Sequence, residues 1–149
     1  MCALFLAVAI AACAAAPAFA QSVAAQAGAE GLARRCAASG GRPVAQPGLT
    51  RAIDLGGQIA SALDPQRLTC AGAAPVDCGP FGCKLSIYFA GTTPVFETYV
   101  KAWRARGGRL DILRVGAYCA SEGESCSETY RREGEELTLA GKGGAVFAR

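Results

Sequence analysis

The chain contains no histidine, although it is 149 residues long. Ser-His-Asp and Cys-His nucleophilic catalysis need an imidazole to move a proton, and many metal centres need one as a ligand. The absence of histidine excludes these chemistries. Two other enzyme signatures are missing, because the chain has neither Gly-x-Ser-x-Gly nor Ser-x-x-Lys. The glycines around Lys142 lack the upstream glycine and the following Ser or Thr of a phosphate loop, so they predict a turn.

Charge is sparse, since 18% of the residues are charged and the formal net charge is +3. So mild an excess does not predict nucleic-acid binding. The basic residues group in one segment and the acidic residues in the next: Lys101, Arg104, Arg106, Arg109 and Arg114, then Glu122, Glu124, Glu128, Glu133, Glu135 and Glu136. We predict two solvated neighbouring hairpins whose opposite charges face each other, each exposed pair contributing about 0 to 1 kcal/mol. A surface that binds polyanions is the alternative.

No charged residue occurs in the first twenty positions, which are almost wholly apolar and end in Ala18, Phe19 and Ala20. This ending is the small-x-small cleavage pattern of an export signal. We therefore predict a signal peptide over residues 1–20 and a single disulfide-stabilised domain over residues 21–149, located in the periplasm or secreted. No Lys or Arg precedes the apolar run, so a longer leader is an alternative.

Two further alternatives involve the membrane. Cys13 follows Ile-Ala-Ala, which is similar to the box after which bacterial lipoproteins are cut and acylated. The chain would then be a lipoprotein anchored through Cys13. The apolar run also comes close to the roughly 20 residues of a spanning helix, so a retained anchor is the other alternative. Without lipidation we expect no stable membrane insertion.

Eight cysteines are present, and Cys2 and Cys13 lie in the predicted leader, which leaves Cys36, Cys70, Cys78, Cys83, Cys119 and Cys126. An even number in an oxidising compartment predicts disulfides. Glycine and proline separate Cys78 from Cys83, and Gly123 lies between Cys119 and Cys126. These residues allow tight loops whose ends approach each other. Two local disulfides are therefore predicted, and elimination pairs Cys36 with Cys70.

The pair Cys78 and Cys83 has two other interpretations, a zinc site and a redox site. With the second local pair it could supply four thiolates to zinc, but an exported chain meets an oxidising compartment first. A redox site would show Cys-x-x-Cys at the start of a helix. Here Cys83 leads into residues 84–89, where Leu85, Ile87 and Phe89 alternate with more polar residues as in a strand. We predict a disulfide that closes a loop before a strand, and no metal or cofactor.

The remaining elements follow from capping, periodicity and turn residues. An alanine-rich helix is expected over residues 22–38, with Cys36 in its last turn and Gly40 and Gly41 after it. Pro43 and Pro47 predict a connector. Short strands are expected over residues 49–55 and 84–89, and a short strand or an extended piece over residues 67–70. A turn at residues 56–57 leads into residues 58–63, and a second turn is expected at residues 64–65.

The C-terminal half predicts hairpins. Residues 95–115 read as two strands joined by Gly107 and Gly108, with a helix over residues 95–103 as the alternative. Residues 128–132 and 136–139 read as a second hairpin, and a short apolar run follows over residues 145–148. The predicted fold is α+β, with an N-terminal helix packed on a mainly antiparallel sheet of about seven short strands and stapled by disulfides.

Four stretches within residues 32–126, LARRCAASGGRP, IDLGGQIASALDPQRLTCAGA, CGPFGC and YCASEGESC, resemble a group of small, uncharacterised exported bacterial proteins in layout and cysteine placement. In that group the segment matching residues 53–63 often reads like an Asp-rich calcium loop. This chain departs from the pattern, because Gly56 and Gln58 follow Asp54 where oxygen ligands belong and Ile59 replaces the loop glycine. One carboxylate cannot build a cage of six to eight oxygens, so only the turn is expected.

These features predict a non-enzymatic binding or accessory module of the cell envelope, whose partner is an unknown protein or envelope component, with no catalytic residue. The aromatic residues Tyr88, Tyr99, Trp103 and Tyr118 are candidates for a binding surface, and packing in the core is the alternative. The alternative function is a small secreted hydrolase that uses a carboxylate pair among Glu122, Glu124 and Glu128. An exposed aromatic or basic surface favours the first function, and a buried pair of glutamates favours the second.

Overall fold

The computed structural model describes residues 22–119 and 125–143. Within these residues one helix, α1 (Val23–Ala38), precedes eleven strands, with short 3-10 helices η1 (Pro65–Arg67) and η2 (Gly116–Tyr118) between them. The strands are β1 (Arg42–Ala45), β2 (Thr50–Asp54), β3 (Ile59–Leu63), β4 (Leu68–Ala71), β5 (Cys78–Gly79), β6 (Gly82–Tyr88), β7 (Phe96–Val100), β8 (Ala102–Arg106), β9 (Arg109–Val115), β10 (Ser125–Glu133) and β11 (Glu136–Gly143).

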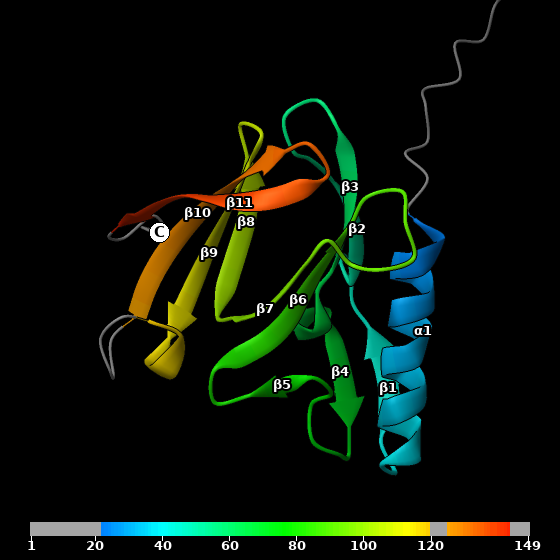
Figure 1. Cartoon of the computed structure of the whole chain (residues 1–149). Helices are drawn as coiled ribbons and strands as arrows, with labels where there is room; N and C mark the ends of the chain where they lie inside the picture. The colour runs from blue at the N-terminus through cyan, green and yellow to red at the C-terminus, as the bar shows by residue number, and fades with distance from the viewer. Residues whose placement is uncertain (1–21, 120–124, 144–149) are drawn as a thin grey trace, which may run out of the picture.

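The described strands form three antiparallel sheets, which makes the fold α+β and mainly β. Strands β2, β3, β6 and β5 form the central sheet, in which β7 also pairs with β6. Strands β8 to β11 form the C-terminal sheet in the order β11-β10-β9-β8, and β1 pairs with β4 in a two-stranded ribbon. Figure 1 shows α1 on one side of the central strands and the C-terminal sheet on the other.

The sequence-based prediction of one sheet with about seven strands is therefore wrong in strand number and in packing. Pro43 was expected in a connector but lies in β1, where it pairs with Cys70. A two-stranded ribbon has free outer edges, so a residue without a backbone N–H is tolerated there. Where the sequence predicts one strand before Gly107, the structure has two, β7 and β8. The chain leaves the central sheet at Lys101, whose backbone N–H donates to the carbonyl of Leu113 in the C-terminal sheet at 2.8 Å. The helical alternative for this segment is also wrong.

Two apolar clusters lie on opposite faces of the central sheet. The larger lies between the two main sheets and contains Leu85 and Ile87 of β6 together with Leu110 and Ile112 of β9. The smaller contains Tyr88 of β6 with residues of α1. Alternation along β6 causes this division, because successive side chains of a strand point to opposite faces. The alternation predicted for residues 84–89 is confirmed.

Helix α1 forms where the alanine content and the glycines at 40 and 41 predict. Ser22 is the N-cap, and its hydroxyl accepts a hydrogen bond from the backbone N–H of Ala25 at 3.2 Å. The backbone N–H of Ser22 donates to the hydroxyl of Ser61 in β3 at 2.8 Å, which ties the start of the helix to the central sheet. Leu32 and Cys36 are buried on the face that packs against the rest of the chain.

Three disulfides staple the fold, and all three predicted pairings are confirmed. Cys36–Cys70 joins the last turn of α1 to β4, with a Cα–Cα distance of 5.6 Å. Cys78–Cys83 links two residues that pair directly between β5 and β6. Cys119–Cys126 connects η2 to β10. Such a set suits a chain that folds in an oxidising compartment. None of the helices in the described part is long and apolar enough to cross a membrane.

Glycine turns close the hairpins, and one arginine joins two of them. Gly107 and Gly108 have φ of 57° and 74°, which is the backbone that a tight β8–β9 hairpin needs. The guanidinium of Arg132 in β10 donates to the carbonyl of Leu55 at 3.1 Å and to that of Gly134 at 2.7 Å. The second predicted hairpin is thus held against the turn after β2. The predicted run over residues 145–148 lies outside the described residues.

Candidate functional site

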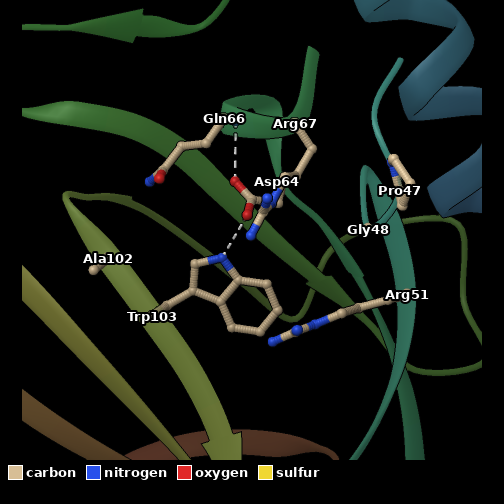
Figure 2. A pocket seen from close by; sticks show the side chains of 8 residues that line it. All are labelled: Pro47, Gly48, Arg51, Asp64, Gln66, Arg67, Ala102 and Trp103. Atoms are coloured by element: carbon tan, nitrogen blue, oxygen red, sulfur yellow. Dashed lines mark hydrogen bonds between the residues drawn. The ribbon is translucent and has the colours of Figure 1, made fainter. Parts of the chain in front are cut away.

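A cavity of about 200 Å³ opens where the central and C-terminal sheets meet beside η1. We call it the Arg51–Trp103 cavity. Figure 2 shows the residues that define it, which are Arg51 from β2, Asp64, Gln66 and Arg67 from the turn after β3, and Trp103 from β8. Trp103 is the only tryptophan of the chain. Of these residues, the sequence analysis named only Trp103 as a candidate for a binding surface.

Asp64 forms the floor of this cavity. It is 5% exposed, and its carboxylate accepts hydrogen bonds from the indole N–H of Trp103 at 2.9 Å and from the backbone N–H of Gln66 at 3.0 Å. A buried carboxylate needs such donors because it has lost its water. Each oxygen receives one of the two bonds, so the carboxylate holds the indole in place.

Gln66 connects the turn after β3 to the segment between β7 and β8. Its side-chain amide donates to the carbonyl of Val100 at 3.2 Å and to that of Lys101 at 3.3 Å. These carbonyls lie at the point where the chain passes from β7 to β8. The turn after β3 is therefore bonded to the crossing between the sheets, and the cavity is formed before any ligand binds.

Two guanidinium groups extend into the same region (Figure 2). That of Arg51 lies 4.1 Å from the centroid of the Trp103 ring, which is a cation–π contact. Arg67 extends from the turn toward Asp64. Both residues are exposed, and in the described part of the chain neither forms an ion pair. Both guanidinium groups can therefore donate hydrogen bonds to an anion that enters the cavity.

A second hollow, of about 310 Å³, is lined by three aromatic rings and the disulfide loop before β6, and we call it the aromatic recess. Phe81 and Tyr118 are 39% and 40% exposed, and their rings meet edge to face with centroids 5.4 Å apart. The ring of Tyr99 in β7 also lies near Tyr118, with ring centroids 6.0 Å apart. Tyr99 and Tyr118 were sequence candidates for a binding surface, and the structure brings them together.

The loop at the base of the aromatic recess is rigid. The Cys78–Cys83 disulfide encloses Phe81, and Gly82 takes a φ of 107° where a Cβ would collide with the carbonyl of Val100. Asp77, which precedes the disulfide, has a φ of 53° and an ion pair with Arg35 of α1 at 2.6 Å. A non-glycine residue in this region of backbone space is uncommon and requires surrounding support. Phe81 is therefore presented on a loop that is held at several points.

Of the carboxylates proposed for a hydrolase, only Glu128 lies among the described residues. Glu128 is 7% exposed and lies opposite Ile112 in the β9–β10 register, and Asp111 is 6% exposed and lies opposite Thr129. Neighbouring residues of a strand face opposite sides of the sheet, so the sheet separates Glu128 from Asp111. Glu122 and Glu124 lie outside the described residues. No pair of buried glutamates is present in the part of the chain that the structure describes.

Glu128 belongs instead to a buried network. Its Oε2 lies 3.1 Å from Nε of Arg114, and the hydroxyl of Tyr130 donates to the same oxygen at 2.7 Å. Nε of Arg114 makes no hydrogen bond in the described structure, so the contact is an ion pair in which the N–H points elsewhere, while the Nη2 atom donates to the Tyr130 hydroxyl at 3.0 Å. Burial, followed by the bond to Glu128, raises the pKa of Tyr130 to about 12.

This network corrects the prediction that the opposite charges of the two hairpins meet in exposed pairs. The side chains of Arg114 and Glu128 are 15% and 9% exposed, so this pair is buried. Arg104 pairs within its own hairpin, with Asp111 at 3.1 Å. Sequence spacing shows which charges are near each other along the chain, but the strand register decides which side of the sheet each one occupies.

The other residues that the sequence analysis named as candidates serve the fold. Tyr88 is 7% exposed and packs in the cluster below α1. It therefore belongs to the core and not to a binding surface. Asp54 accepts a hydrogen bond from the backbone N–H of Gly57 at 2.7 Å and caps the turn after β2. Among the described residues there is no group of three or more carboxylates or cysteines that could hold a metal ion.

Sequence reasoning missed Arg51, Asp64 and Phe81. Phe81 carried a usable signal, because an aromatic residue inside a disulfide-closed loop of glycine and proline cannot reach the core easily. The sequence contains no such signal for Asp64 and Arg51, since an aspartate in a turn and an arginine in a strand are ordinary surface residues. The chain matches no protein-family profile, no curated protein and no solved structure.

Proposed function

We propose that this chain is a non-enzymatic binding module of the cell envelope, which docks a partner protein on the aromatic recess. The observation that carries the proposal is the group of three rings around an apolar hollow, of which Phe81 and Tyr118 are exposed and Tyr99 is partly exposed. Large aromatic side chains supply most of the energy at many protein interfaces, because they bury a large area and lose few rotamers. Exposed rings gathered in this way are typical of an interaction site.

The rigidity of the recess supports binding over catalysis. The Cys78–Cys83 disulfide and the Asp77–Arg35 ion pair hold the loop that carries Phe81. A preformed surface loses less conformational entropy when a partner binds. The arrangement of the acids supports the same choice, because Glu128 and Asp111 lie on opposite sides of the C-terminal sheet. A carboxylate pair that hydrolyses a glycoside must flank one bond.

The proposed location is the periplasm or the exterior of the cell, after removal of residues 1–20. The three disulfides support an oxidising compartment. A lipoprotein anchored through Cys13 is the alternative location. In either case the aromatic recess would face the envelope space, where a partner protein can reach it.

The test is capture of a partner from periplasmic extract by immobilised protein, repeated with Phe81→Ala and Tyr118→Ala. We expect the captured amount to fall about tenfold or more in each variant, because hot-spot aromatics cost about 2 kcal/mol or more when truncated. The matched control is Leu139→Ala, since Leu139 is similarly exposed at 45% but lies on β11, away from the recess. Equal capture by all variants, each with the thermal stability of the parent chain, would refute the proposal.

A further inference from the structure

The Arg51–Trp103 cavity presents two free guanidinium groups on a rigid floor, and it is separate from the aromatic recess. None of the residues that line one hollow lines the other. Five other arginines, Arg34, Arg35, Arg104, Arg114 and Arg131, already pair with a carboxylate of the chain. Within residues 22–119 and 125–143, Arg51 and Arg67 pair with no carboxylate, although Asp64 lies in the same cavity.

Asp64 does not satisfy these arginines because its oxygens are engaged elsewhere. One oxygen accepts from Trp103 and the other from the backbone of Gln66, at 2.9 and 3.0 Å. The carboxylate is therefore held in the floor, 5% exposed, and it is not within ion-pair distance of either arginine. Its charge still acts on the cavity, since Coulomb interactions extend beyond contact distance.

Arg51 is oriented for binding by the indole. Its guanidinium stacks on the Trp103 ring at 4.1 Å from the centroid, and the ring is itself fixed by its bond to Asp64. A stacked guanidinium keeps its N–H groups in the plane of the fork, where they can donate to two oxygens of one acceptor. Arg67 approaches from the opposite element, the turn after β3 (Figure 2).

We propose that Arg51 and Arg67 bind a single carboxylate group in the Arg51–Trp103 cavity. The formal charges of Arg51, Arg67 and Asp64 add to +1, which matches a monoanion. A dianionic phosphate would leave an uncompensated negative charge beside the buried carboxylate, which is unfavourable. A cavity of about 200 Å³ is smaller than most sites for whole small molecules, so it suits a carboxyl group and the carbon atoms next to it.

The carboxylate can come from three sources that share this chemistry: an acidic side chain of a protein, the C-terminus of a chain, or a free small acid. The indole of Trp103 reports on all three. It gives a single side-chain N–H signal in an ¹⁵N-correlated spectrum, because the chain has one tryptophan. That N–H lies in the cavity and donates to Asp64, so a ligand held by Arg51 shifts its resonance.

The experiment is a titration of the ¹⁵N-labelled protein with acetate, N-acetylglycine and N-acetylglutamate amide as free-acid, chain-end and side-chain probes. Sodium chloride at equal ionic strength and inorganic phosphate are the comparison titrants. We expect a saturable shift of the Trp103 signal with at least one carboxylate, and the tightest of the three identifies the source. A shift that chloride reproduces, or tighter binding of phosphate than of every carboxylate, would overturn the proposal.

Variants assign the binding to the two arginines. Arg51→Gln and Arg67→Gln should each weaken the carboxylate affinity about tenfold, because each removes a charge-assisted pair of hydrogen bonds. Arg51→Lys should recover only part of the affinity, since an ammonium cannot donate bidentately. The matched control is Arg42→Gln on β1, another exposed arginine outside the cavity. An affinity that is the same in Arg51→Gln, Arg67→Gln and Arg42→Gln would contradict the assignment.

Discussion

Trp103 donates its indole N–H to the buried carboxylate of Asp64 at 2.9 Å, although 39 residues separate the two in the chain. The bond joins β8 of the C-terminal sheet to the turn after β3 of the central sheet. It contributes to the packing of the two sheets and also positions the ring on which Arg51 stacks. One interaction thus supports both the fold and the proposed carboxylate site.

Trp103→Phe should lower the free energy of unfolding by about 1 to 3 kcal/mol, because a buried oxygen of Asp64 loses its donor. Urea denaturation followed by far-ultraviolet circular dichroism measures the effect, since the substitution removes the only tryptophan. A double-mutant cycle with Asp64→Ala isolates the pair. Strictly additive costs of the two substitutions would show that the bond contributes nothing.

Gly82→Ala should destabilise the chain by more than about 2 kcal/mol, because Gly82 has a φ of 107° and its Cβ would collide with the carbonyl of Val100. Gly79→Ala is the matched control in the same disulfide loop. Its Cβ would meet no atom within 4 Å, so a change within about 0.5 kcal/mol is expected. Chemical denaturation of both variants measures their free energies of unfolding, and equal values would refute the predicted collision at Gly82.

Removal of the long disulfide should cost more stability than removal of a short one. Cys36 and Cys70 are 34 residues apart and Cys78 and Cys83 are 5 apart. Loop entropy predicts losses of about 4 and about 2 kcal/mol when each pair is replaced by Ala. Thermal melts of the two double variants give the order. Non-reducing peptide maps serve as the control that the remaining pairs are unchanged, and the opposite order of stability would contradict the loop-entropy account.

Stability should fall as the pH rises above 10, because burial raises the pKa of Tyr130 to about 12 from its ordinary value of 10.0. The folded chain holds the phenolic proton more tightly, so this contribution is complete below pH 10 and is lost as the pH rises through 12. By pH 11 the loss from Tyr130 is about 1 kcal/mol. Urea unfolding at pH 9 and pH 11 measures it.

Tyr130→Phe should reduce this fall, because the variant has no phenolic proton at this position. Tyr88, whose pKa burial also raises, contributes equally in the variant and in the parent chain and does not affect the comparison. The same pH dependence in Tyr130→Phe as in the parent chain would exclude Tyr130 as the cause.

Export should shorten the chain, so that the protein isolated from the periplasm begins at Gln21. Intact-mass measurement should show the loss of residues 1–20, because Ala18 and Ala20 form the small-x-small cleavage site. A mass that corresponds to diacylglyceryl-modified Cys13 would instead place the protein on a membrane surface. Ala20→Leu is the control variant, since a large residue next to the cut should block processing.

Local features of the sequence were sufficient for several elements. The glycines at 40 and 41 predict the end of α1, and Gly107 and Gly108 predict the β8–β9 turn, because helix stops and positive φ depend on only a few neighbouring residues. The two short disulfides follow from spacing for the same reason. The long disulfide then required only elimination.

The division into two sheets could not be read from the sequence. Val100 and Trp103 are both apolar and lie three residues apart, yet Val100 belongs to a strand of the central sheet and Trp103 to a strand of the C-terminal sheet. The switch at Lys101 depends on which partner strands are available. The position of Pro43 in β1 likewise depends on β4, which follows 25 residues later in the chain.

The sequence by itself determined the cysteine framework, the helix and the hairpin turns, because each of these follows from short-range spacing. Only the tertiary structure decided which side chains meet. Arg51 stacks on Trp103 because β2 and β8 approach each other across the two sheets. Glu128 and Asp111 are kept apart because the register of β9 and β10 sends neighbouring positions to opposite faces. Contacts of this kind are set by strand pairing over long separations, for which a single sequence contains no local signal.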